Sequence, residues 1–386
     1  MGLTSGIFLA AAIAAAFALP LATVLLWNRL RGPQPVRAAT RFGLIGLCQG
    51  SAVLLAALLI NNSFQLYLSW SDLLGEDGGP GRIQAQSPVA APTGLPGSLR
   101  ADRALPNAAL FHDFAGAAGV RAATITGPRS DVTGSVYVWL PPQYSQAAYA
   151  HSEFPVIQLL SGYPGSPITW LEGMQAPRIL SREMASSGVH PFILVAAAIN
   201  VDPPHDPDCS NIPGGPQVDT WLTDDVHSLV ETAYRTRTDA KGWGLMGYSE
   251  GGLCASKLVL QHPDVFGAAV SMSGDDHPDG DLLRAGTPAY NHNSPLWLLQ
   301  NRPPAAVALL LTGTLQDGAT AAEADAMSRA AKNPTVVSRA IAPRGGHNVG
   351  VWMAAEPEGF EWLSQYLEGV RSDPGDGSVM LAPLNR

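Results

Sequence analysis

Two long stretches of apolar, uncharged residues open the chain. The first runs from Gly6 to Trp27, and the second runs from Phe42 to Trp70 and is most apolar over 42–60. About 20 consecutive apolar residues are enough to cross the hydrocarbon core of a bilayer. The pattern therefore predicts a membrane anchor over residues 1–74, with transmembrane helices at about 6–27 and 42–60.

The loop between these stretches carries the positive charge of the region. Residues 1–70 contain four basic residues, Arg29, Arg31, Arg37 and Arg41, and no acidic residue. Basic loops remain in the cytoplasm, so both ends of the anchor are expected outside. A cleaved signal peptide fits less well, because no basic segment precedes Gly6 and a second apolar stretch follows. We expect a multi-pass protein of the cell membrane, with the lipid bilayer as a partner and the rest of the chain extracytoplasmic.

Beyond the anchor the pattern of residues changes twice. Residues 75–106 are rich in Gly, Pro, Ser and Ala without apolar periodicity, which is typical of a flexible linker. Residues 107–371 contain the regular pattern of a folded domain. Residues 372–386 form a Gly- and Asp-rich tail that we expect to be loosely ordered.

The domain of residues 107–371 alternates short β-rich runs with helical patterns. Several runs are apolar throughout, as expected for strands that are covered on both faces. The predicted strands are 120–126, 134–140, 155–160, 192–199, 242–246, 266–272, 307–312 and 335–342. The predicted helices include 218–234, 251–262, 320–332 and 358–367. This alternation predicts an α/β domain with a mainly parallel sheet.

The N-terminal region of the chain is basic, whereas the rest of the chain is acidic. The chain has 23 Lys and Arg against 32 Asp and Glu, and every acidic residue lies after residue 70. Binding to nucleic acid needs clustered Lys and Arg, so the composition argues against a nucleic-acid partner. Three cysteines are too few for a disulfide scaffold. The sequence carries no signal for the oligomeric state.

A candidate nucleophile follows the strand predicted at 242–246. Ser249 stands in the segment Gly-Tyr-Ser-Glu-Gly, with Gly247 two residues before it and Gly251 two residues after it. A tight turn from a strand into a helix exposes such a serine, and a side chain at either glycine would collide with neighbouring backbone. The strand before and the helix after this segment favour a nucleophile elbow over an ordinary glycine-rich turn.

A serine hydroxyl needs a base to remove its proton, usually a histidine that a carboxylate orients. Among the nine histidines, His347 is best placed, in a glycine-containing loop after the last predicted strand. Asp317, which follows the strand predicted at 307–312, is the first candidate for the acid. Asp317 could instead cap the helix that begins near Thr320. The alternative acids are Glu323 on that helix and the neighbouring pair formed by Asp275 and Asp276.

Ester chemistry also needs N–H donors that stabilise the developing oxyanion. The backbone N–H of Glu250, directly after the nucleophile, is the first expected donor. The second is expected in the turn after the strand at 155–160. Pro164 has no N–H, so we choose Tyr163, with Gly162 as the next candidate.

Two acid-rich loops raise the question of a metal site. One contains Asp202, His205, Asp206 and Asp208, and the other contains Asp275, Asp276, His277 and Asp279. Neither has a recognised ligand spacing, so we interpret both as solvated loops at the rim of a cleft. We therefore expect no metal ion and no organic cofactor. Cys209 and Cys254 could form a disulfide outside the cell, but the sequence does not give their separation.

These motifs resemble the esterase D and trehalose mycolyltransferase branch of the α/β-hydrolases over about residues 120–367. Residues 159–163 are similar to the oxyanion turn of that family, and residues 219–225 are similar to the helix before its nucleophile strand. Residues 346–348, together with Trp352, are similar to its histidine loop. The membrane-anchored architecture is similar to uncharacterised actinobacterial members of this branch. Mycolyltransferases carry an aspartate where this chain has Ser161, and their acid is a glutamate within a helix, which keeps Glu323 in contention.

The sequence therefore predicts an α/β-hydrolase fold preceded by two transmembrane helices. We expect a membrane-tethered serine esterase that hydrolyses carboxylic esters through an acyl-enzyme on Ser249. One alternative is a cell-envelope acyltransferase that moves an acyl group to a sugar or another alcohol. A further alternative is a non-catalytic envelope-binding module, but the presence of Ser249, an acid and His347 together argues against it.

Overall fold

The computed structural model describes residues 3, 5–64, 67, 70–74, 84–85 and 107–372. The predicted linker and tail lie outside the described residues, apart from Gln84, Ala85 and Ser372. At Ala85 the chain contacts the domain, because its N–H donates a hydrogen bond of 2.8 Å to the Glu358 carboxylate. The predicted flexibility of the linker remains a prediction.

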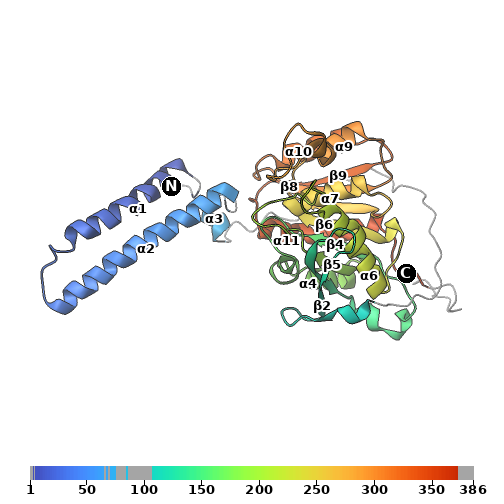
Figure 1. Cartoon of the computed structure of the whole chain (residues 1–386), viewed down its shortest axis with the longest axis horizontal. Helices are drawn as coiled ribbons and strands as arrows, with labels where there is room; N and C mark the ends of the chain where they lie inside the picture. Colours follow the sequence, from blue (N-terminus) through green and yellow to red (C-terminus); the bar gives the residue numbers. More distant parts are fainter. Residues whose placement is uncertain are drawn as a thin grey trace.

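The N-terminal region is a hairpin of two long helices that lie side by side (Figure 1). Helix α1 covers Gly6–Leu26 and helix α2 covers Gln34–Phe64, followed by the short α3 at Trp70–Leu73. Both long helices are apolar and long enough to cross a membrane. Helix α2 extends beyond the predicted 42–60 at both ends. At its N-terminal end the added residues include Gln, Arg and Ala, which continue a helix as readily as apolar residues do.

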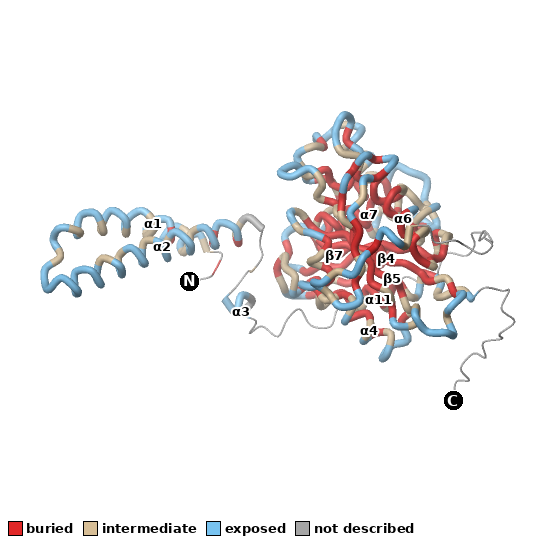
Figure 2. Tube along the Cα trace, turned by 60° about the horizontal axis from the view of Figure 1, so that its bottom comes forward, coloured by how far each residue is buried: buried red, intermediate tan, exposed pale blue. Residues whose placement is uncertain are grey.

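Most side chains of the hairpin point outward rather than into a core. Figure 2 shows exposed residues along nearly the whole of α1 and α2, whereas the buried residues gather in the domain. Phe17, Val24 and Phe42 are among the large apolar side chains that remain exposed. Water is a poor environment for so many exposed apolar groups on two neighbouring helices. This exposure is what lipid-facing helices require.

The domain is built on one sheet of nine strands in the order β1-β2-β3-β5-β4-β6-β7-β8-β9. Strands β1, β2 and β3 are antiparallel at one edge, and β5, β4, β6, β7, β8 and β9 run parallel to one another. The strands are β1 (His112–Asp113), β2 (Val120–Thr126), β3 (Thr133–Trp139), β4 (Val156–Leu160), β5 (Ile193–Ala197), β6 (Trp243–Tyr248), β7 (Ala268–Met272), β8 (Ala308–Thr314) and β9 (Val336–Ala342). All eight predicted strands are present, with ends shifted by at most two residues. The two-residue β1 was not predicted.

Helices cover both faces of the sheet, as the continuous apolar strands require. The helices of the domain are α4 (Ala176–Ser186), α5 (Val218–Thr220), α6 (His227–Ala233), α7 (Glu250–Gln261), α8 (Pro288–His292), α9 (Pro295–Asn301), α10 (Thr320–Ala330) and α11 (Val349–Tyr366). One core cluster packs side chains of α6, α7 and α10 against the sheet, and the other packs α4 and α11 against the opposite face. The predicted α/β-hydrolase architecture, a mainly parallel sheet with helices on both faces, is confirmed.

Two predicted helices differ from the structure in their limits or form. The helix predicted at 358–367 begins nine residues earlier, at Val349, because Asn348 caps it by accepting a hydrogen bond of 3.2 Å from the Val351 N–H. Pro357 lies inside this helix without ending it. The helix predicted at 218–234 is interrupted by a π-helical segment at Trp221–Val226 between α5 and α6.

Candidate active site

Ser249 lies at the tight turn between β6 and α7. Its backbone has φ 56° and ψ −127°, a conformation that is strained for a residue with a side chain. A Cβ atom at Gly247 would lie 1.8 Å from the Gly251 carbonyl oxygen, and one at Gly251 would lie 2.2 Å from the Leu160 carbonyl oxygen. Only glycine fits both positions, so the turn has the geometry of a nucleophile elbow.

His347 lies against Ser249, although the two residues are far apart in the sequence. The Nε2 atom of His347 is 2.7 Å from the Oγ atom of Ser249. The ring packs edge-on against Trp352, with 5.1 Å between ring centroids, and Trp352 stacks on Tyr248 of β6 at 4.5 Å. These aromatic contacts restrict the ring orientation of a histidine that stands in a loop.

Asp317 lies on the other side of the imidazole. Its Oδ1 and Oδ2 atoms are 3.0 and 3.2 Å from the Nδ1 atom of His347, and the side chain is almost fully buried. The alternative role of Asp317 as a helix cap does not occur, because Ala319 is the N-cap residue of α10 and no side chain caps that end. The loops of the two residues are also tied together, since the Thr314 hydroxyl donates to the Gly345 carbonyl at 2.6 Å.

The alternative acids contact one another rather than His347. Glu323 accepts a hydrogen bond of 3.3 Å from the Asp276 N–H, and the Asp276 carboxylate lies 2.5 Å from the Nδ1 atom of His277. Asp275 lies in the same group, and burial together with Glu323 raises the pKa of Asp275 to about 7. In the described part of the chain, therefore, it is Asp317 that the fold places against the imidazole.

The predicted oxyanion turn lies directly over the nucleophile. A Cβ atom at Gly162 would be 2.9 Å from the Cβ atom of Ser249. The N–H of Tyr163 donates to no group among the described residues, and the N–H of Glu250 is the first of α7, where no helical acceptor exists. Neither N–H group therefore has a backbone acceptor within the described part of the chain.

Asn200 holds this turn in place and was not identified from the sequence. Its side-chain amide donates to the carbonyl oxygens of Gly162 at 3.1 Å and Gly165 at 2.6 Å. A possible signal was the position of Asn200 just after β5, because groups at the carboxyl ends of adjacent parallel strands meet at one edge of the sheet.

Two groups of side chains have a spacing that could suit a metal ion. Asp276, His277 and Glu323 bring one ligand atom each within 4.8 Å of one another, as do Cys209, Glu250 and Cys254. The second group cannot act in this way with free thiolates, because Cys209 and Cys254 form a disulfide. This bond answers the question that the sequence left open about the two cysteines, and it attaches the loop before α5 to the helix that begins after Ser249.

The side chain of Glu250 is almost fully buried, with 5% of its surface exposed. Burial and the neighbouring Asp206 carboxyl group raise the pKa of Glu250 well above its usual range. Further along α7, Lys257 is completely buried and donates to Ser210 at 2.5 Å and Asn293 at 2.8 Å. Burial lowers the pKa of Lys257. Neither side chain was singled out from the sequence.

The fold and the arrangement around Ser249 define an α/β-hydrolase, an enzyme of the serine hydrolase type. Residues 130–354, more than half of the chain, match the model of the family described as "Putative esterase". The chain therefore belongs to this esterase family.

A curated relative and several solved structures are similar to the chain. An uncharacterized protein of Corynebacterium glutamicum is 25% identical over 255 residues, which make up 59% of this chain and 56% of that protein. The match thus spans about half the length of this relative.

Three solved structures share the fold at low sequence identity. A ferulic acid esterase is 20% identical with a TM-score of 0.56, covering 64% of this chain and 98% of its own. An S-formylglutathione hydrolase from Agrobacterium tumefaciens is 14% identical with a TM-score of 0.55, covering 64% of this chain and 95% of its own. A fluorophosphonate-binding serine hydrolase of Staphylococcus aureus is 16% identical with a TM-score of 0.52, covering 64% of this chain and 98% of its own.

Proposed function

We propose that the protein is a membrane-tethered serine esterase that hydrolyses carboxylic esters through an acyl-enzyme on Ser249. The observation that carries this proposal is the chain of contacts from Ser249 Oγ to His347 Nε2, at 2.7 Å, and from His347 Nδ1 to Asp317 Oδ1, at 3.0 Å. In this arrangement the imidazole accepts the serine proton while the carboxylate maintains its tautomer and orientation. Membership of the esterase family supports the same assignment.

The reaction proceeds in two halves. Ser249 Oγ attacks the ester carbonyl, its proton passes to His347, and the tetrahedral intermediate collapses when His347 gives that proton to the departing alcohol. A water molecule then loses a proton to His347 and attacks the acyl-enzyme, which releases the carboxylic acid and restores Ser249. The N–H groups of Glu250 and Tyr163 stabilise the negative oxygen in both intermediates.

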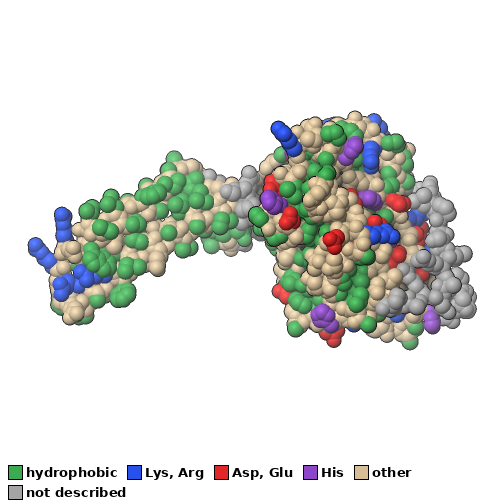
Figure 3. Space-filling view, in the orientation of Figure 1, with side chains coloured by type: hydrophobic (Ala, Val, Ile, Leu, Met, Phe, Trp, Pro, Cys, Tyr) green, Lys and Arg blue, Asp and Glu red, His purple; other side chains and the backbone are tan. Residues whose placement is uncertain are grey.

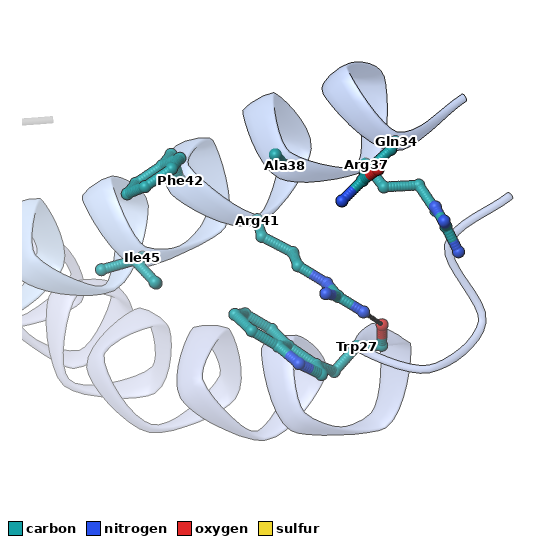
Figure 4. Close-up of a pocket in the computed structure, with 7 residues that line it drawn as sticks. All are labelled: Trp27, Gln34, Arg37, Ala38, Arg41, Phe42 and Ile45. Carbon is teal, nitrogen blue, oxygen red and sulfur yellow. Dashed lines mark hydrogen bonds between the residues drawn. The ribbon is translucent and has the colours of Figure 1, made fainter. Parts of the chain in front are cut away.

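The helical hairpin is the proposed membrane anchor. Figure 3 shows Lys and Arg side chains at the loop end of the hairpin, with hydrophobic side chains along the rest of it. At this end the Arg41 guanidinium lies 4.6 Å from the centre of the Trp27 ring and donates to the Trp27 carbonyl at 3.1 Å (Figure 4). Trp and Arg are suited to the interface between lipid and water, and basic loops favour the cytoplasmic side. The domain is then extracytoplasmic.

The disulfide between Cys209 and Cys254 supports the same orientation. Such bonds form and persist outside the cytoplasm, where thiols are not kept reduced. The substrate is accordingly an ester available at the outer surface of the membrane.

The test combines labelling and turnover with the full-length protein in detergent or vesicles. A fluorophosphonate probe is expected to label wild-type protein but not Ser249→Ala, and p-nitrophenyl esters of increasing chain length then report the acyl preference. Parallel reactions contain sugars or simple alcohols as acceptors. Acylated acceptor as the main product would identify the alternative acyltransferase, and absence of both labelling and turnover would overturn the enzymatic proposal.

A further inference from the structure

A cavity of about 330 Å³ is lined by both long helices at the loop end of the hairpin. Trp27, directly after α1, lines one side of it, and side chains of α2 between residues 34 and 45 line the other. The lining positions of α2 are three or four residues apart, so they lie on one face of the helix. Both helices therefore build this cavity, which contains no residue of the candidate active site.

The lining of the cavity changes from basic to apolar along α2. Arg37 and Arg41 lie toward the loop, whereas Phe42 and Ile45 lie further along the helix (Figure 4). Phe42 and Ile45 are also exposed, among the apolar side chains that face lipid in the proposed anchor. A molecule that suits both ends of the cavity combines an anionic group with hydrocarbon.

The positive charge at this end of the hairpin has no counter-charge within the hairpin. Residues 1–70 contain four arginines and no acidic residue. Arg37 and Arg41 are four residues apart on one helix, and like charges at that spacing repel each other. An anion bound between the two guanidinium groups would replace this repulsion with attraction.

Arg41 is held in the cavity by Trp27 and keeps an unused donor. Its guanidinium lies 4.6 Å from the centre of the Trp27 ring and donates to the Trp27 carbonyl at 3.1 Å. The Nε atom of Arg41 is buried and donates to no group in the described part of the chain. A buried N–H without an acceptor costs free energy, which an acceptor on a ligand would recover. Phosphate is well suited, because the planar guanidinium matches pairs of phosphate oxygens.

We propose that this cavity binds an anionic phospholipid, with its phosphate between Arg37 and Arg41 and its acyl chains along Phe42 and Ile45. The inference goes beyond the esterase activity and rests on the proposed membrane anchor, which places the loop between α1 and α2 at the cytoplasmic surface. Anionic lipids give the cytoplasmic leaflet its negative surface potential, and basic pockets between transmembrane helices on that side bind their headgroups. The bound lipid fixes the depth of the hairpin in the bilayer.

An anionic lipid suits the cavity better than a free phosphate ion or a zwitterionic lipid. Inorganic phosphate would use only the basic end and leave Phe42 and Ile45 without a partner. The ammonium group of a zwitterionic lipid would lie near two guanidinium groups, and residues 1–70 offer it no carboxylate. The proposed ligand is therefore a phospholipid with a net negative headgroup.

The test measures the lipid preference of the full-length protein in detergent micelles. Phosphatidylglycerol and phosphatidylcholine with identical acyl chains are added as an equimolar mixture, and native mass spectrometry quantifies the protein that carries each lipid. Detergent removes the orientation in the membrane as a variable. The wild-type protein is expected to retain phosphatidylglycerol about tenfold or more over phosphatidylcholine, because each nearby arginine strengthens the binding of an anionic lipid by about fivefold.

Two variants locate the preference and a third controls for the loss of charge. Arg37→Gln and Arg41→Gln are each expected to reduce the preference by about fivefold, and the double variant should remove it. Arg31→Gln is the matched control, because Arg31 lies in the same loop but does not line the cavity. It removes the same charge and should change the preference by less than about twofold.

The two cavity variants differ in their risk to folding. Arg41→Gln also loses the contacts with Trp27, so circular dichroism is used to confirm that its helices are retained. Arg37 is exposed, and Arg37→Gln therefore tests the proposal without that complication.

Each contrary result has a separate meaning. Equal retention of the two lipids would overturn the lipid site, and equal losses in Arg31→Gln and Arg37→Gln would overturn it in favour of diffuse attraction to the basic loop. Displacement of phosphatidylglycerol by an equimolar amount of inorganic phosphate would overturn it in favour of a phosphate site. Failure of the full-length protein to float with phosphatidylcholine vesicles would overturn the membrane anchor and the lipid site with it. Fluorophosphonate labelling of Ser249 tests the esterase activity independently of all these results.

Discussion

The Nδ1 atom of His347 lies 3.0 Å from the Oδ1 atom of Asp317, a buried carboxylate 30 residues earlier in the chain. The opposite ring nitrogen faces Ser249 at 2.7 Å. A single imidazole therefore bridges the ends of three parallel strands, since these residues follow β6, β8 and β9.

We predict that Asp317→Asn is far more damaging than either alternative change. Loss of the carboxylate leaves the imidazole without control of its tautomer, which lowers kcat by about 10⁴ in comparable sites. Glu323→Gln and Asp276→Asn should stay within about tenfold of wild type, because both residues contact each other rather than His347. Esterase rates of the three variants show which acid orients His347. A larger loss of kcat in Glu323→Gln than in Asp317→Asn would identify Glu323 on α10 as that acid.

Ser249→Ala should abolish fluorophosphonate labelling and reduce kcat by about 10⁴ to 10⁶. The change removes only a hydroxyl at a turn whose flanking glycines remain, so circular dichroism and the melting temperature should match the wild-type protein. Retention of more than about a tenth of the activity by a folded variant would exclude Ser249 as the nucleophile.

Asn200→Ala should lower kcat about tenfold to a hundredfold with little change in KM. The substitution removes both hydrogen bonds to the Gly162 and Gly165 carbonyls, so the turn that carries the Tyr163 N–H loses its fixed position. Asn107→Ala is a suitable control, because it removes one side-chain hydrogen bond, to Thr232, away from the site. Equal effects of the two variants would show that Asn200 contributes only to folding.

The free energy of unfolding should depend on pH through Asp275. Burial and Glu323 raise the pKa of Asp275 in the folded protein to about 7, above the value of about 3.9 in the unfolded chain. The folded state therefore binds the proton of Asp275 more tightly than the unfolded chain does. The contribution of Asp275 to the free energy of unfolding is fully present below about pH 4 and is lost as the pH rises to about 7.

Asp275→Asn should remove this loss of stability at high pH, because the amide does not titrate. After allowance for solvent screening, the variant is expected to gain roughly 1 to 2 kcal/mol over wild type at pH 8 and nothing at pH 4. Chemical unfolding of the full chain at both values measures the difference, with Asp264→Asn as the exposed control. A gain that is the same at both pH values would show that charge repulsion is not the cause.

Protease added to spheroplasts should remove the domain from intact membranes. A reporter that is active only outside the cell should function when fused after Arg371, because the basic loop between α1 and α2 stays in the cytoplasm. Protection of the domain, with such a reporter active only when fused between Arg31 and Arg37, would reverse the orientation.

The sequence alone was sufficient for the features that depend on local pattern. Continuous apolar runs such as 307–312 predicted strands to within two residues, since a strand covered on both faces must be apolar throughout. The glycines at 247 and 251 identified the elbow, because its backbone leaves no room for a Cβ atom. The length of the two apolar, uncharged stretches was enough to predict the two N-terminal helices.

The tertiary structure decided the relations between residues far apart in the chain. The sequence favoured Asp317 as the acid but left Glu323 and the pair Asp275 and Asp276 as alternatives, and the order of β7, β8 and β9 in the sheet placed Asp317, and not Asp276, against His347. The same holds for the disulfide between Cys209 and Cys254 and for the approach of the two acidic loops. Local pattern determines which elements form, but distances across a sheet depend on how the whole chain packs.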